Sequence, residues 1–129
     1  MAAVALSTDS FPDTIKQGIV LVDFWASWCG PCRTFAPIYE AASERHADVV
    51  FGKVDTEAEP VIAAAFEIRA IPTLMVFRDG ILLFANPGVL PAAAVDRLIG
   101  EVKKLDMDEV RRKLAEAPPE GAAKASSGA

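Results

Sequence analysis

The sequence predicts an α/β domain in which a single mixed β-sheet is flanked by helices on both faces. Residues Ile19–Trp25 form a continuous apolar run, which is typical of a central strand covered on both sides. Strand-like and helix-like segments then alternate, which favours parallel strands joined by right-handed crossovers. An Asp-Gly pair between two later apolar runs indicates a hairpin, which adds antiparallel strands.

Length and composition limit the possible classes of protein. The 129 residues suffice for one domain, and a hydrophobic share of 52% can fill its core. A net charge of −5 argues against nucleic-acid binding, which normally uses a basic face. No segment has the apolar length of a membrane span, and the N-terminus lacks the basic residues of a secretory signal. We therefore expect a cytoplasmic protein without nucleic-acid or membrane partners, and a monomer.

The first half of the chain predicts two helices around the central strand. Ser10 or Asp9 is a suitable cap for a short helix with Pro12 in its first turn. From residue 31 to about residue 46, apolar side chains recur at helical spacing. Pro37 lies inside this second helix, and we expect it to kink the helix without ending it, because the pattern resumes afterwards.

The second half predicts a strand, a short helix, the hairpin and a final amphipathic helix. In chain order these segments are Val49–Val54, Glu59–Phe66, Thr73–Phe77 with Ile81–Phe84, and Pro91–Lys104. We place the domain at residues 1–106 and a helical extension, capped by Asp106, at residues 107–117. Residues 118–129 contain no large apolar side chain, so we expect them to form a solvated tail.

The motif that carries chemistry is Trp28-Cys29-Gly30-Pro31-Cys32, where the central strand passes into a helix. A thiolate at a helix N-terminus faces unpaired N–H groups and the positive end of the helix dipole, which lower its pKa. Pro31 suits the first helical turn, Gly30 allows a tight turn, and Trp28 can flank the sulfurs. We expect Cys29, exposed at the helix mouth, to attack a disulfide, and Cys32, one turn on, to resolve the mixed disulfide.

Two other uses of this cysteine pair are weaker. A purely structural disulfide would close a very short loop, which gives little stabilisation through chain entropy. A zinc site needs about four ligands, and His46 is the only histidine available beside the pair. We expect no metal, and a C-terminal helix cap is the simpler role for His46.

Several separate motifs resemble the thioredoxin family. They are residues 22–26 (Val-Asp-Phe-Trp-Ala), the full Trp-Cys-Gly-Pro-Cys, Pro37, residues 53–55 (Lys-Val-Asp), residues 71–73 (Ile-Pro-Thr) and Gly88. The likeness spans roughly Leu6 to Leu105. It implies the thioredoxin fold and the reduction of disulfides in target proteins. It also implies recycling by thioredoxin reductase, the partner to which NADPH and FAD belong, so this chain would bind no cofactor.

The resemblance also assigns roles to residues around the cysteines. Asp23 interrupts the apolar strand, so its carboxylate should be buried and costly to ionise. In the family the matching aspartate lies behind the second cysteine and handles its proton, and Lys53 matches a lysine near it. The Ile71–Pro72 bond should be cis and face the disulfide, leaving the Ile71 backbone free to pair with substrate. Trp28 and Gly88 should contact the partner.

The chain departs from the family pattern at two positions. Ala70 stands where many thioredoxins have glycine, and Pro87 stands where a small aliphatic residue is usual. Both lie beside the expected substrate surface, so substrate preference can differ. Two alternatives stay open here: an oxidising or extracytoplasmic disulfide enzyme, and a thioredoxin-fold interaction subunit whose dithiol is incidental.

Overall fold

A computed structural model describes residues 3–116, which form one five-stranded sheet and five helices. The strands lie in the order β1-β3-β2-β4-β5. Their bounds are Ala3–Ala5 (β1), Ile19–Trp25 (β2), Val50–Asp55 (β3), Thr73–Arg78 (β4) and Ile81–Pro87 (β5). Strands β1, β3 and β2 are parallel, whereas β4 pairs antiparallel with β2, and β5 antiparallel with β4. The predicted mixed sheet is confirmed.

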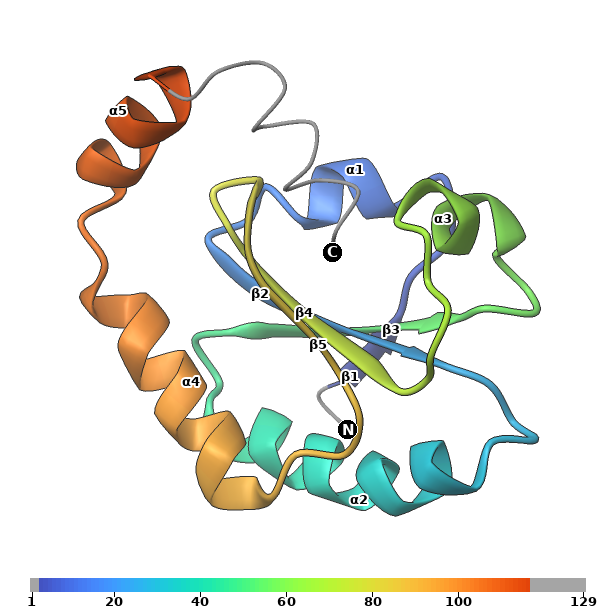
Figure 1. Cartoon of the computed structure of the whole chain (residues 1–129). Coiled ribbons are helices and arrows are strands. Elements are labelled where there is room, and N and C mark those ends of the chain that lie inside the picture. The colour runs from blue at the N-terminus through green and yellow to red at the C-terminus, as the bar shows by residue number, and fades with distance from the viewer. Residues whose placement is uncertain (1–2, 117–129) are drawn as a thin grey trace.

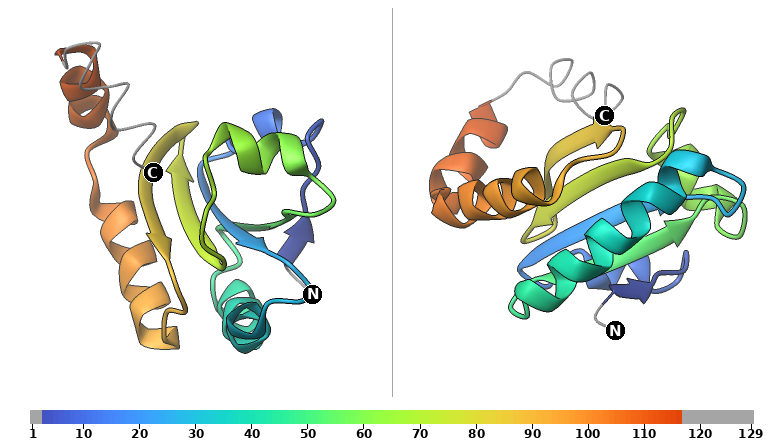
Figure 2. Two further views of the ribbon diagram at one scale, coloured as in Figure 1. Left: turned by 45° about the vertical axis from the view of Figure 1, so that its right-hand side comes forward. Right: turned by 90° about the horizontal axis from the view of Figure 1, so that it is seen from below.

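The helices cover both faces of the sheet, as predicted (Figures 1 and 2). Helices α1 (Phe11–Thr14) and α3 (Pro60–Ala65) lie on one face. Helices α2 (Gly30–Arg45) and α4 (Ala92–Lys104) lie on the other. Helix α5 (Met107–Glu116) follows α4 and lies away from the middle of the sheet.

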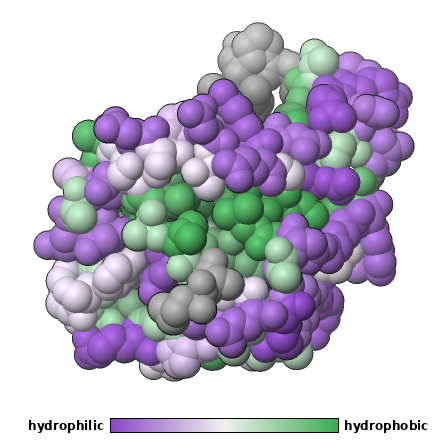
Figure 3. All heavy atoms as spheres, turned by 180° about the vertical axis from the view of Figure 1, so that it is seen from behind, coloured by the Kyte–Doolittle hydropathy of each residue, from purple (hydrophilic) through white to green (hydrophobic). Residues whose placement is uncertain are grey.

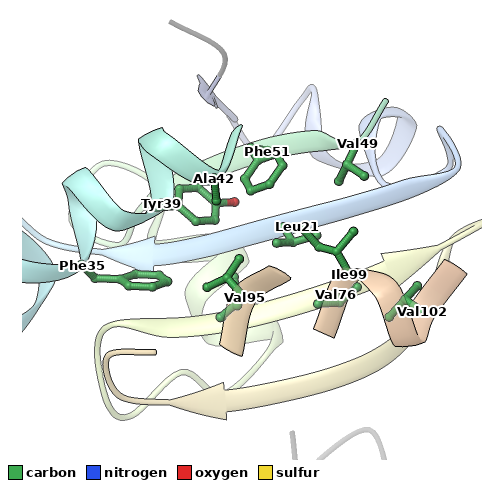
Figure 4. Packing of buried hydrophobic residues seen from close by; sticks show 11 residues of the cluster. Leu21, Phe35, Tyr39, Ala42, Val49, Phe51, Val76, Val95, Ile99 and Val102 are labelled. Atoms are coloured by element: carbon green, nitrogen blue, oxygen red, sulfur yellow. The ribbon is translucent and has the colours of Figure 1, made fainter. Parts of the chain in front are cut away.

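Alternation along β2 divides the core into two clusters. Leu21 packs with side chains of α2 and α4 (Figure 4), whereas Val20, Val22 and Phe24 pack with side chains of α1 and α3. Because successive side chains of a strand point to opposite faces, Asp23 shares the face of Leu21. The carboxyl group of Asp23 is thereby directed to the side of the sheet that α2 covers.

The N-terminal strand was not predicted from the sequence. Strand β1 has only three residues, too few for a periodic pattern, and its register with β3 pairs Ala5 with Lys53. Leu6, just after β1, packs over Gly52: a β-carbon at Gly52 would lie 2.5 Å from Leu6 Cδ1. The edge of the sheet is therefore held by a close contact that no local sequence pattern reveals.

The first helix begins where predicted, but its cap differs. Ser10 occupies the N-cap position of α1 and Pro12 lies in the first turn, yet the Ser10 hydroxyl makes no capping bond to the helix. Instead Ser10 Oγ accepts a hydrogen bond from the Ser7 backbone N–H at 2.9 Å. The predicted side-chain cap is therefore wrong, because the preceding loop takes up the hydroxyl. In α2, the helix continues through Pro37 as predicted.

The hairpin prediction is confirmed at the turn between β4 and β5. Asp79 and Gly80 both have positive φ angles, 55° and 83°, which is the arrangement that matches strand twist in a two-residue turn. Arg78, the last residue of β4, donates a hydrogen bond to the Val102 carbonyl oxygen at 2.8 Å. This contact joins the hairpin to the end of α4.

Helix α5 is attached to the same end of the sheet. Asp106 Oδ1 accepts hydrogen bonds from the backbone N–H groups of Asp108 and Glu109, which confirms the predicted cap. Met107 is buried, and Arg111 forms an ion pair with Asp79 of the hairpin turn at 3.5 Å. The boundaries at residues 106 and 117 stay a prediction, and the predicted tail at residues 118–129 lies outside the described residues.

On the face opposite to the view of Figure 1, hydrophilic residues surround a group of apolar residues in the middle (Figure 3). Within residues 3–116, none of the helices has the length and apolar character required to cross a membrane.

Candidate active site

A disulfide joins Cys29 and Cys32 at the junction between β2 and α2, with their Cα atoms 5.2 Å apart. Cys29 is the N-cap of α2 and has extended backbone angles. Its Sγ accepts a hydrogen bond from the Cys32 backbone N–H at 3.2 Å. An N–H group directed at a sulfur at a helix N-terminus favours the thiolate form of that sulfur in the reduced protein.

The exposed surface of the two cysteines does not distinguish them. We expected Cys29 to be exposed, but its exposed fraction is 4%, against 3% for Cys32. This prediction is wrong because Cys29 packs in one cluster with Ala26, Cys32, Trp25 and Ile71. The two sulfurs differ instead in their neighbours: Cys29 Sγ lies 3.5 Å from the Ile71 carbonyl oxygen, and Cys32 lines a cavity behind the disulfide.

The segment before β4 lies against the disulfide, and the residue after β5 is bonded to that segment. The Ile71–Pro72 peptide bond is cis, as the family resemblance implied. Gly88 has a φ of +104°, and its N–H donates a hydrogen bond to the Pro72 carbonyl oxygen at 2.8 Å. The structure thus places the segment before β4 next to Cys29, and Gly88, just after β5, is hydrogen-bonded to that segment.

The residues between and beside the cysteines lie where the motif predicts. Pro31 is in the first turn of α2, and Trp28 is 65% exposed. Gly30, however, has no positive φ, and a β-carbon there would meet only Arg33 Nη2 at an ordinary 3.9 Å. The backbone at this turn therefore does not require glycine, contrary to the expectation from the sequence.

The carboxyl group of Asp23 is buried, with an exposed fraction of 1%. Its Oδ1 has no hydrogen-bond partner within residues 3–116. Burial raises the pKa of Asp23 from 3.8 to about 7, and the positive charge of Lys53 partly opposes this rise. A carboxyl group with a pKa near neutrality can both accept and return a proton at physiological pH.

Asp23 and Cys32 line one cavity of about 90 Å³ between the sheet and the start of α2. Its other lining residues are Trp25, Ala26, Ser27, Arg33, Ala36 and Lys53. Asp23 and Lys53 are also paired in register across β2 and β3. The cavity is lined mainly by apolar surface, and its volume is large enough to admit water. Three of the predicted site residues, Asp23, Cys32 and Lys53, therefore line one cavity that is partly open to solvent.

The sequence did not single out Arg33, Ser27 and Trp25 as parts of this site. Arg33 Nη1 donates a hydrogen bond to the Ser27 carbonyl oxygen at 2.8 Å, which ties the first turn of α2 to the loop before the cysteines. The apolar run of residues 19–25 indicates only a core role for Trp25. Its position two residues after Asp23, on the same face of β2, was the available signal.

The histidine takes no part in this site. His46 is the C-cap of α2, as predicted, and its Nε2 lies 2.7 Å from Asp96 Oδ1 on α4. Among residues 3–116, His, Cys, Asp and Glu side chains form no group of three or more suited to a metal ion.

The arrangement can perform dithiol–disulfide exchange. It combines a disulfide at a helix N-terminus, an exposed tryptophan beside it, and a buried carboxyl group whose pKa of about 7 suits proton transfer. All redox-active atoms belong to the chain itself.

Comparisons with known proteins agree with this geometry. The Thioredoxin family model matches residues 2–112. The chain is 53% identical to a protein of Streptomyces coelicolor that carries the provisional name thioredoxin 2, over 89% of this chain and 87% of that protein. It is 39% identical to the thioredoxin of Staphylococcus saprophyticus, over 88% of this chain and 98% of the relative. The crystal structure of Malassezia sympodialis thioredoxin, 31% identical, superposes with a TM-score of 0.71 and covers 78% of this chain and 93% of its own.

Proposed function

Since the chain belongs to the thioredoxin family, we propose that it reduces disulfides in target proteins with Cys29 as nucleophile and Cys32 as resolving thiol. The chain is a thiol–disulfide oxidoreductase whose redox group is the Cys29–Cys32 disulfide. The assignment of these two roles rests on the position of Cys29 Sγ at the N-terminus of α2, where it accepts a hydrogen bond from the Cys32 N–H.

In the first step, the Cys29 thiolate attacks one sulfur of the target disulfide. The Cys29–target bond forms as the target's own S–S bond breaks, and one target sulfur leaves as a thiolate. In the second step, Cys32 loses its proton and its thiolate attacks Cys29 Sγ. The Cys29–Cys32 bond forms, the mixed disulfide breaks, and the second target sulfur leaves. Two electrons have then passed from this chain to the target, which takes up two protons.

Asp23 is proposed as the base for the second step. It lines the same cavity as Cys32, and burial raises its pKa to about 7. The thiol of cysteine ordinarily has a pKa of about 8.5, so a carboxylate with a pKa near 7 can accept its proton at a modest cost. Lys53 lies beside this carboxyl group and favours its ionised form.

The target is proposed to dock across Trp28, Ile71 and Gly88. Trp28 offers an exposed apolar face beside Cys29. Ile71 lies just before the strand, and its carbonyl oxygen is 3.5 Å from Cys29 Sγ. Because Gly88 has no side chain, a partner backbone can approach the loop after β5 closely.

Thioredoxin reductase is proposed as the partner that returns the disulfide to the dithiol, and the chain is proposed to act as a monomer. Cytoplasmic location also remains a proposal. It is supported by the use of only two cysteines, both in the redox motif, which suits a reducing compartment.

The division of labour can be tested by trapping. Cys32→Ser should accumulate mixed disulfides between Cys29 and target proteins, because the resolving thiol is gone. Cys29→Ser is the matched control and should trap few. Mass spectrometry of the adducts identifies the bonded cysteine. Adducts formed mainly through Cys32 would overturn the assignment.

The proton-transfer role needs a separate measurement. Asp23→Ala should slow the resolution of a preformed Cys29 mixed disulfide by on the order of 100-fold at neutral pH, the lower range for loss of a positioned base. The initial attack by Cys29 should change much less. Stopped-flow measurements of the two steps decide this point. Equal slowing of both steps would contradict the proposed role.

A further inference from the structure

Lys53 is held by an aromatic ring. Its Nζ lies 4.9 Å from the centroid of the Trp25 ring, within the range of a cation–π interaction. Among residues 3–116, no ion pair involves Lys53, although eight ion pairs between other lysine or arginine side chains and carboxylates occur there. The indole face is therefore the contact that fixes the position of this ammonium group.

Trp25, Lys53 and Asp23 lie on one face of the sheet. Trp25 follows Asp23 by two residues on β2, so the two side chains point the same way. Lys53 is the register partner of Asp23 on β3 and a diagonal neighbour of Trp25. All three line the cavity that Cys32 also lines. The ammonium is thus near enough to Asp23 to lower its pKa, without forming an ion pair with it.

Without the contact to the Trp25 ring, the ammonium group of Lys53 would be more favourably placed in solvent. The ammonium group is strongly hydrated and sits on a flexible stem, and Lys53 is only half-buried. Direct pairing with the fully buried Asp23 would require the ammonium to lose its water, which is costly. Without the ring, the ammonium is therefore expected to turn towards solvent.

We propose that Trp25 is a positioning residue for the second step of disulfide exchange: its ring keeps the Lys53 ammonium at the cavity wall, where the positive charge favours the ionised form of Asp23. This inference rests on the proposed role of Asp23 as the base for Cys32. In this inference Trp25, which lies at the end of an apolar strand, adjusts the ionisation of Asp23 by holding Lys53 in place.

The other groups around Asp23 do not replace this effect. From α2, Cys32, Arg33 and Tyr39 face the same region. Tyr39 is buried, its hydroxyl donates to the Gly52 carbonyl oxygen at 2.7 Å, and burial raises the pKa of its phenol. It therefore stays neutral. Arg33 is exposed and is held by Ser27.

The test is an NMR titration of the Asp23 side-chain carboxyl carbon in the oxidised full-length protein. Trp25→Leu should raise the midpoint by about half a pH unit or more, because a cation–π contact that fixes the ammonium is lost. Trp25→Phe should raise it less, because phenylalanine keeps a weaker aromatic face. The pH profile of mixed-disulfide resolution should move in the same direction.

The matched control is the same pair of variants in a Lys53→Met background. If Trp25 acts through Lys53, Trp25→Leu leaves the midpoint unchanged there. An equal shift in both backgrounds, no shift, or a fall in the midpoint would overturn the inference. Should Trp25→Leu fail to fold, Trp25→Phe provides the same comparison. The titration does not depend on catalysis, so an error in the role of Asp23 would appear only in the kinetics.

Discussion

Replacing Asp23 with alanine should make the oxidised protein more stable at pH 8 but not at pH 4. The folded-state pKa is raised from 3.8 to about 7, and at about 1.36 kcal/mol per pKa unit this corresponds to about 4 kcal/mol. Well below pH 3.8 the carboxyl group is protonated in both the folded and the unfolded state, so it does not affect stability. As pH rises towards 7, the unfolded chain ionises and the folded chain does not, so stability falls.

The measurement is urea unfolding at fixed pH values between these limits, for the wild type and Asp23→Ala. The free energy of unfolding of the wild type should fall relative to the variant by about 4 kcal/mol between pH 4 and pH 8. Altered packing in the variant changes its free energy of unfolding by the same amount at every pH, so it does not change how that free energy depends on pH. Asp9→Ala, which removes an exposed carboxylate, is the control. A difference between wild type and Asp23→Ala that does not vary with pH would refute the reasoning.

Three further changes test other parts of the structure. Lys53→Met should raise the pKa of Asp23 further, since the lysine lowers it, and should reduce the stability of the protein at pH 8 in urea melts. Met107→Ala should cost about 2 kcal/mol or more in the same assay, because a buried side chain anchors α5, whereas Leu114→Ala, at a half-exposed position, should cost less than about 0.5 kcal/mol. Deleting residues 118–129 should change stability by less than about 0.5 kcal/mol and leave the rate of disulfide reduction unchanged; a larger effect would mean that this segment docks.

Local sequence patterns were sufficient to predict those structural features that depend on a single segment of the chain. The apolar run of β2 predicted both the strand and the burial of the Asp23 carboxylate that interrupts it. The Asp79-Gly80 pair predicted its own turn, because both residues tolerate positive φ angles. The spacing of Cys29 and Cys32 placed the disulfide at the start of a helix.

Features that depend on two distant segments were not predictable in this way. Strand β1 is defined by its pairing with β3 and is too short to show a period. The burial of Cys29 depends on Ile71, which another part of the chain supplies. The contact between Trp25 and Lys53 depends on the register of two strands. Sequence spacing constrains neighbours along the chain, whereas register and loop packing are set by the whole fold.

Helix α5 is attached at the end of the molecule that lies opposite to the disulfide. Strand β4 starts next to Pro72 and ends at Arg78, so the hairpin turn that binds Arg111 lies about 17 Å from the disulfide end of that strand. Helix α5 and the start of α2 accordingly lie at opposite sides of Figure 1. A dye, an affinity handle or a solid support coupled to an exposed residue of α5 would leave the approach to Cys29 open. This geometry makes α5 a practical anchoring point for redox sensors and immobilised reductants built from this chain.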